Sequence, residues 1–214
     1  MKPTLSERMS QRILVLDGAM GTMLQKRNLS EEVFHGADSL FSTHKLKGLY
    51  DVLNLTAPLE VEAVHRLYLE AGADVIETNT FNAQRVSLAA YGLEDQTVQI
   101  NRAAAMLARR VADEYTSRNP QKPRYVVGAV GPTPKICVLE GSVTASTLPQ
   151  ISSLQLQEAY LEQISALIEG GVDALLIETI YHLDNARVAV RAAIQAMEAV
   201  GRTIPLMLSF TIPQ

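Results

Sequence analysis

The sequence predicts a single α/β domain in which parallel strands alternate with crossover helices. Its 214 residues favour one domain, with 47% hydrophobic and 20% charged residues, the composition of an ordinary globular protein. Short apolar runs, mostly without alternating polar residues, are separated by long segments of helical periodicity. Such runs are typical of strands buried on both faces of a parallel sheet. The length also lies near the lower limit for an eight-stranded βα barrel, so that architecture stays open.

The predicted elements follow in order along the chain. The strands are predicted at 13–16, 75–76 with their flanks, 125–130, 174–177 and 206–210. The helices are predicted at 57–71, 83–91, 95–117, 153–168 and 184–200. Thr56 and Asp184 are the predicted amino-terminal caps of the first and last of these helices. Gly72 and Gly201 are placed to end the same two helices.

Composition argues against several classes of protein. A net charge of −4 and scattered Lys and Arg residues provide no basic face for nucleic acid or an anionic membrane. No apolar run approaches the roughly 18 to 20 residues of a membrane helix, and no signal peptide pattern is visible. The single Cys137 cannot form an internal disulfide and reads as a small buried residue. We expect a cytoplasmic protein without nucleic acid or membrane partners.

Two helix-to-strand joints have similar sequences. "EAGADVIET" at 70–78 and "EGGVDALLIET" at 169–179 share Glu, Gly and Asp at the same spacing, then an apolar run, then Glu-Thr. A glycine that ends a helix and a polar residue that starts a strand are common at any such joint. That explanation does not account for the Glu-Thr pairs.

Acidic residues follow three of the predicted strands: Asp17, Glu77 and Glu178. Because the carboxyl ends of parallel strands meet on one face, where such folds place their sites, we expect these acids to converge. Each acid taken alone is equally explained as a cap of the following loop. Together with neighbouring threonine hydroxyls they suit a small ligand with an ammonium group, a sugar or a metal.

The glycines of "LDGAMGT" at 16–22 lack the spacing of a dinucleotide fingerprint. A tight turn whose free amides can hold a carboxylate is the better interpretation. The histidines are scattered, and no Cys or His cluster has the spacing of a zinc site.

Four motifs in this order resemble the homocysteine S-methyltransferase family: "RILVLDGAMGTMLQ", "AGADVIETNTF", "KPRYVVGAVGPT" and "GGVDALLIETI". The resemblance runs from about Arg12 onward and is strongest to the amino-terminal homocysteine-binding domain of cobalamin-dependent methionine synthases. The stretches "LKGLYDVLNLTAPLEVEAVH" and "NPQKPRY" favour this branch over the betaine-dependent one.

The resemblance implies a (βα)8 barrel of the TIM type, of which this chain would hold about five strands and four helical connections. Residues 1–11 would be an extension and 12–214 an incomplete barrel domain. The implied reaction transfers a methyl group from methylcobalamin to the sulfur of homocysteine, giving methionine. Cobalamin-binding and folate-binding domains of the same full-length protein are the implied partners.

The resemblance also assigns roles to residues of the predicted pocket. Asp17 and Gly18 match the turn that binds the amino acid end of homocysteine, and Glu178 matches the acid that anchors its ammonium group. The second-strand motif implied to line the same pocket consists of Glu77, Thr78, Asn79 and Thr80. The family's zinc is held by three cysteines, expected beyond residue 214, and Cys137 aligns with none of them. No catalytic residue or metal ligand is therefore assigned here.

Two other interpretations stay open. The chain can be a non-catalytic amino-acid-binding or interaction fragment that lacks the zinc site. Less favoured is a different barrel enzyme, such as a metal-dependent lyase that uses the three acids directly. Because five strands with four helices cannot close an eight-stranded barrel, the first and fifth predicted strands are expected to keep unpaired apolar edges.

Overall fold

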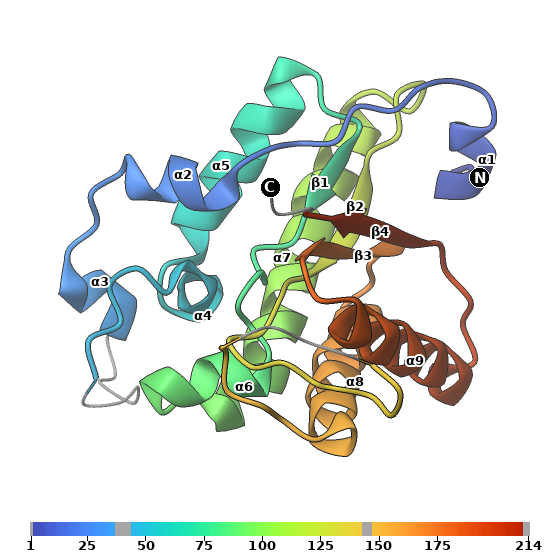
Figure 1. Cartoon of the computed structure of the whole chain (residues 1–214). Coiled ribbons are helices and arrows are strands. Elements are labelled where there is room, and N and C mark those ends of the chain that lie inside the picture. The colour runs from blue at the N-terminus through green and yellow to red at the C-terminus, as the bar shows by residue number, and fades with distance from the viewer. Residues whose placement is uncertain (1, 37–43, 143–146, 212–214) are drawn as a thin grey trace.

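A computed structural model describes residues 2–36, 44–142 and 147–211. Its centre is a parallel sheet with the strand order β1-β2-β3-β4, which confirms the predicted α/β class with parallel strands. The strands are β1, Val75–Glu77; β2, Tyr125–Val130; β3, Ala174–Ile180; and β4, Leu206–Phe210. Figure 1 shows the long helices α7, α8 and α9 beside this sheet.

The predicted long helices are all present. They are α5, Pro58–Ala71; α7, Thr97–Arg118; α8, Ser153–Glu169; and α9, Leu183–Val200. The predicted helix at 83–91 is α6, Arg85–Leu88, followed by the 3-10 turn Ala89–Tyr91, and another such turn, Glu94–Gln96, precedes α7. Short helices in the amino-terminal part were not predicted: α1, Leu5–Met9; α2, Met20–Gln25; α3, Glu31–His35; and α4, Leu53–Thr56, after the 3-10 turn Tyr50–Val52. None of the helices in the described part of the chain is long and apolar enough to cross a membrane.

The predicted strand at 13–16 is not a regular strand. It contributes one isolated parallel bridge between Leu16 and Val75. Its main chain still follows β1, because Asp17 N–H donates to Val75 O at 2.9 Å and Asp74 N–H donates to Val15 O at 2.8 Å. With β1 only three residues long, the segment has few main-chain partners.

Both predicted amino-terminal caps are wrong. Thr56 ends α4, and α5 begins at Pro58 with Ala57 as its cap and no side-chain capping bond. Asp184 lies inside the first turn of α9, where its carboxylate accepts the Leu139 N–H at 3.2 Å. The Thr56 hydroxyl instead donates to Val52 O at 3.4 Å, and Asp184 makes a tertiary contact in place of a cap. The predicted helix ends at Gly72 and Gly201 are confirmed, both in the left-handed conformation.

Both faces of the sheet are largely buried along β1, β2 and β3, as the non-alternating runs indicate, whereas β4 is partly exposed. On one face Val126 and Val130 pack into a core with α7, α8 and α9. On the other face Tyr125 and Val127 pack with Leu5 of α1. The helix α1 therefore covers the amino-terminal end of the strands and leaves their carboxyl ends free for a site.

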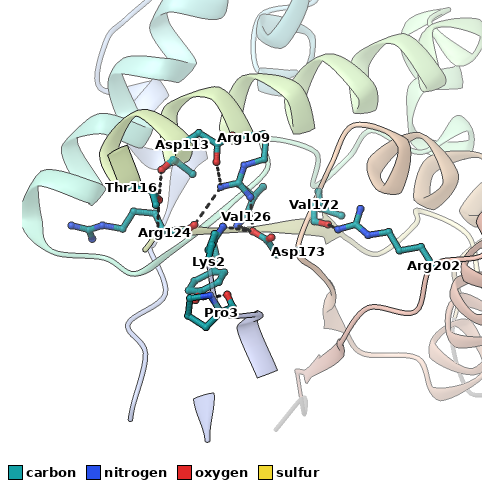
Figure 2. A network of polar contacts seen from close by, with 12 residues as sticks. Lys2, Pro3, Arg109, Asp113, Thr116, Arg124, Val126, Val172, Asp173 and Arg202 are labelled. Atoms are coloured by element: carbon teal, nitrogen blue, oxygen red, sulfur yellow. Dashed lines mark hydrogen bonds and ion pairs between the residues drawn. The ribbon is translucent and has the colours of Figure 1, made fainter. Parts of the chain in front are cut away.

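The aspartates of the two similar joints perform the same structural task. Asp74 accepts the Val15 N–H at 3.0 Å, and Asp173 accepts the Val126 N–H at 2.8 Å. Each carboxylate thus ties the preceding segment to its own strand. Asp173 also pairs with Arg109 at 2.6 Å, within a polar network shown in Figure 2. These aspartates lie at the start of their strands, away from the acids that end them.

Candidate functional site

A cavity of about 410 Å³ opens at the carboxyl ends of the strands. It is lined by the segments 18–21, 50–51 and 77–82 and by Glu178, and is called the acid cavity below. Its volume lies in the lower part of the range found for small-molecule sites. The elements that build it come from the segment after the first predicted strand, from the turn before α4, and from the ends of β1 and β3.

Three carboxyl groups influence one another at this cavity. Asp17 directly precedes the lining segment 18–21 and accepts the Glu77 N–H at 3.0 Å. Burial, assisted by the charges of Glu77 and Glu178, raises the pKa of Asp17 to about 8. Burial and the charge of Glu178 raise the pKa of Glu77 to about 7, and burial also raises the pKa of Glu178. The predicted convergence of these acids is therefore present in the fold.

No cation balances these acids among the residues that the structure describes. The ion pairs found there do not include Asp17, Glu77 or Glu178, and the lining segments contain no Lys, Arg or His. Elsewhere the fold pairs its buried acids, as in the contact of Asp74 with Arg12. The raised pKa values of Asp17 and Glu77 mean that ionising these carboxyl groups in the cavity is costly unless a ligand supplies a positive charge. The arrangement therefore suits a cationic ligand.

An irregularity in β3 accompanies the position of Glu178. The register with β4 shifts between Ile177 and Ile180, which is the pattern of a β-bulge. Thr179 within it has a φ of 56°, in the left-handed region that β-branched residues rarely adopt. Backbone strain of this kind costs about 1–3 kcal/mol and is frequent at functional sites. The bulge thus coincides with the position of Glu178, which lines the cavity.

The loop after β1, residues 78–82, forms one wall of the acid cavity and is called the β1 loop below. Its hydroxyls are engaged within the protein: the Thr78 and Thr80 oxygens lie 2.6 Å apart, the Ala129 N–H donates to Thr78 at 3.0 Å, and Thr80 donates to Ala129 O at 2.7 Å. Asn79 donates its amide to Tyr50 O at 2.7 Å. Thr78, Asn79 and Thr80 thus shape the wall, and their predicted contact with a ligand remains a prediction.

The first turn of α2 lines the cavity on another side. Met20 and Gly21 are lining residues, and α2 begins with Ala19 as its cap and without a side-chain capping bond. The N–H groups of a first helical turn have no partner within the helix. The predicted turn after Asp17 therefore brings the amino-terminal residues of α2 to the wall of the cavity. Gly18 fits there because a Cβ at this residue would lie 3.3 Å from the Tyr68 hydroxyl.

Asp51 is a cavity residue that the sequence interpretation missed. Its side chain is 2% exposed, lines the cavity and accepts the Asn82 N–H at 2.7 Å. Burial raises the pKa of this carboxyl to about 6. The signal was present as an acid inside the apolar stretch "GLYDVLNL", a pattern similar to the acid that follows the apolar run in "LLIET".

The described residues do not fit a zinc site. They contain no group of three or more His, Cys, Asp or Glu side chains arranged to hold a metal ion. Cys137 is 1% exposed, and burial together with the charge of Asp184 raises the pKa of its thiol. A buried thiol with a raised pKa is a poor metal ligand, because the thiolate is the form that binds.

The family model described as homocysteine S-methyltransferase matches residues 14–214. Among solved structures, the metallated form of the homocysteine methyltransferase MmuM from Escherichia coli is 25% identical with a TM-score of 0.69, over 95% of this chain and 65% of that chain. Its oxidized form is 26% identical with a TM-score of 0.68, over 95% and 64%. The apo form, 22% identical with a TM-score of 0.62 over 98% and 63%, supports the fold alone. The chain thus spans just under two thirds of the length of these structures.

Proposed function

Because this chain belongs to the homocysteine S-methyltransferase family, we propose that its acid cavity binds homocysteine as the acceptor of a methyl group, giving methionine. The observation that carries the proposal is the set of acids without a cation at the carboxyl ends of the strands. A free amino acid brings the missing positive charge. The cavity volume of about 410 Å³ suits a ligand of that size.

In this proposal the two ends of the amino acid are held by different elements. Glu178 and Glu77 accept hydrogen bonds from the ammonium group, with Asp17 behind them. Charge-assisted bonds of this kind are shorter and stronger than neutral ones. For the carboxylate we propose main-chain N–H groups around Met20 and Gly21, residues that line the same cavity. The side chain then carries the sulfur away from the acids.

The methyl donor we propose is methylcobalamin, carried on a separate domain, with a folate-binding domain as a further partner. The support is the resemblance of "LKGLYDVLNLTAPLEVEAVH" and "NPQKPRY" to methionine synthases. A cavity of about 410 Å³ is far too small to enclose a cobalamin, so the cofactor would be presented from outside. Since the described residues do not fit zinc, we assign this chain the binding of the amino acid and no metal-dependent step.

Replacing Glu178 with Gln tests the proposal. The substitution keeps the shape but removes the charge that faces the ammonium group. We expect homocysteine binding, measured by calorimetry, to weaken by about 1.5–3 kcal/mol, the scale of a hydrogen bond to a charged group. The control variant is Glu198→Gln, on the exposed side of α9, which should bind like the wild type.

A second ligand makes the test specific for the ammonium group. The compound 4-mercaptobutanoate keeps the thiol and the carboxylate of homocysteine but lacks the ammonium. We expect it to bind much more weakly to the wild type and to be insensitive to Glu178→Gln. Equal affinity of the wild type for both ligands would contradict the proposed role of the acids.

A further inference from the structure

We propose that Asp51 is a positioning residue of the acid cavity, which fixes the β1 loop in the shape that amino acid binding requires. The inference rests on the proposed function of the cavity. It concerns a residue that does not itself have to contact the ligand. Its role is to hold the wall formed by residues 78–82 against the turn before α4.

Four hydrogen bonds connect the turn before α4, the residue Asn54 within α4, and the β1 loop. Asn82 N–H donates to the Asp51 carboxylate at 2.7 Å, and Asn79 donates its amide to Tyr50 O at 2.7 Å. Asn54 donates its amide to both Asp51 O and Asn79 O, each at 2.7 Å. The two segments lie about thirty residues apart in sequence, so these hydrogen bonds are tertiary contacts that help to set the spacing of the segments on that side of the cavity.

Asp51 holds Asn82 through its main chain. The buried Asp51 carboxylate accepts the Asn82 N–H at 2.7 Å. Asp51 is 2% exposed, and none of the ion pairs in the described part of the chain includes it. Burying a carboxylate without a cation opposes folding, so fold stability alone does not explain an aspartate here.

Asn82, the residue that Asp51 holds, lies between two hollows. It lines the acid cavity and also a neighbouring hollow of about 390 Å³ with Tyr91, Pro132 and Tyr181. On the far side of the same loop, Gly131 approaches Phe81 so closely that a Cβ would overlap the Phe81 main-chain oxygen. The β1 loop is thus held from both sides, and a displacement of Asn82 would change the mouth of the cavity.

Three substitutions of Asp51 separate position from charge. Asp51→Ala removes the acceptor of the Asn82 N–H, and we expect homocysteine affinity to fall by about 10- to 100-fold, as for a misplacement of about 1 Å. Asp51→Asn keeps an acceptor at the same distance and should stay within about threefold of the wild type. Asp51→Glu keeps the charge but moves the acceptor by one methylene, so it should weaken binding as the alanine variant does.

The matched control is Asp184→Ala. Asp184 is also a buried aspartate, 3% exposed, that accepts a main-chain N–H, but it does not line the acid cavity. It should lower the melting temperature without changing homocysteine affinity. Calorimetry at a temperature where each variant is folded, checked by circular dichroism, gives both readouts.

The outcomes separate this inference from the proposed function. Wild-type affinity in Asp51→Ala or in Asp51→Glu overturns the positioning role, and so does a loss in Asp51→Asn equal to that in Asp51→Glu. If Asp51→Ala does not fold, the comparison of the Asn and Glu variants decides. A wild-type chain that does not bind homocysteine at all overturns the proposed function, and this inference with it.

Discussion

Asp17 and Glu77 make the free energy of unfolding depend on pH near neutrality. The pKa of Asp17 is about 8 in the fold against an ordinary 3.8, and that of Glu77 is about 7 against 4.5. Between the ordinary and the raised values the folded protein binds more protons than the unfolded chain. Stability therefore falls as the pH rises through this window, from about 4 to 8.

Glu77→Gln removes one of the two strongest contributors to this effect. We expect the variant to lose less stability than the wild type between pH 5 and pH 9, with a gain of about 1–2 kcal/mol at pH 9 after allowance for partial exposure. Urea unfolding at pH 5, 7 and 9 measures the free energy of unfolding of both proteins. The exposed Glu198→Gln should follow the wild-type curve, and a Glu77→Gln curve parallel to the wild type would refute the coupling.

The residues of the acid cavity were partly predictable because strand direction alone brings some of them together. Asp17, Glu77 and Glu178 each follow an apolar run, and parallel strands place such residues on one face. Asp51 follows no strand, so strand direction does not predict its place at the cavity. Its position depends on Asn82, a residue 31 positions later whose loop conformation no local pattern encodes.

At the scale of elements, the β1 loop and the turn after β2 are packed together at Gly131. A Cβ at this residue would overlap the main-chain oxygen of Phe81, and main chain cannot move aside as a side chain can. Gly131→Ala is therefore expected to reduce the free energy of unfolding by about 1–3 kcal/mol, the usual cost of overpacking. Urea unfolding monitored by circular dichroism measures the change.

Gly21→Ala is the control for this substitution. Gly21 lies in α2, and a Cβ there would be 3.8 Å from the nearest atom, an ordinary contact with Tyr50. Alanine favours a helix over glycine, so stability should be unchanged or slightly higher. Equal stability of Gly131→Ala and the wild type would show that the two loops are free to separate.

Element length explains most of the difference between the helices that the sequence predicted and those that it missed; the four-residue α6 was predicted as part of a longer helix. The four long helices, α5, α7, α8 and α9, have 14 to 22 residues and repeat their apolar positions several times. The helices α1 to α4 have four to six residues, less than two turns, so no periodicity can be seen. The predicted caps at Thr56 and Asp184 are wrong because their neighbours in the fold were not foreseen. Thr56 belongs to α4, which directly precedes α5, and the Asp184 carboxylate accepts the N–H of Leu139 in a loop.

At the scale of the whole molecule, apolar side chains are exposed on both borders of the sheet. Ile13 is 88% exposed beside β1, and Leu208 and Phe210 are 48% and 50% exposed on the end strand β4. An apolar hollow of about 290 Å³, to which Ile13 and Met207 contribute, lies between these borders. Apolar side chains are therefore exposed on both borders of the sheet, as expected. The predicted first strand, however, pairs with β1 only through the single bridge between Leu16 and Val75.

Exposed apolar edges of a sheet pair with other chains, so we expect this chain to self-associate in isolation. The double substitution Ile13→Lys and Leu208→Lys places charges on both borders, and it should shift the sedimentation equilibrium towards monomer by at least about tenfold in dissociation constant. Leu154→Lys adds a charge at a leucine of α8 that is 65% exposed, outside the borders, and should leave the equilibrium unchanged. The borders do not cause self-association if the wild type sediments as a monomer at every concentration. The same conclusion follows if Leu154→Lys dissociates the oligomer as well as the double variant does.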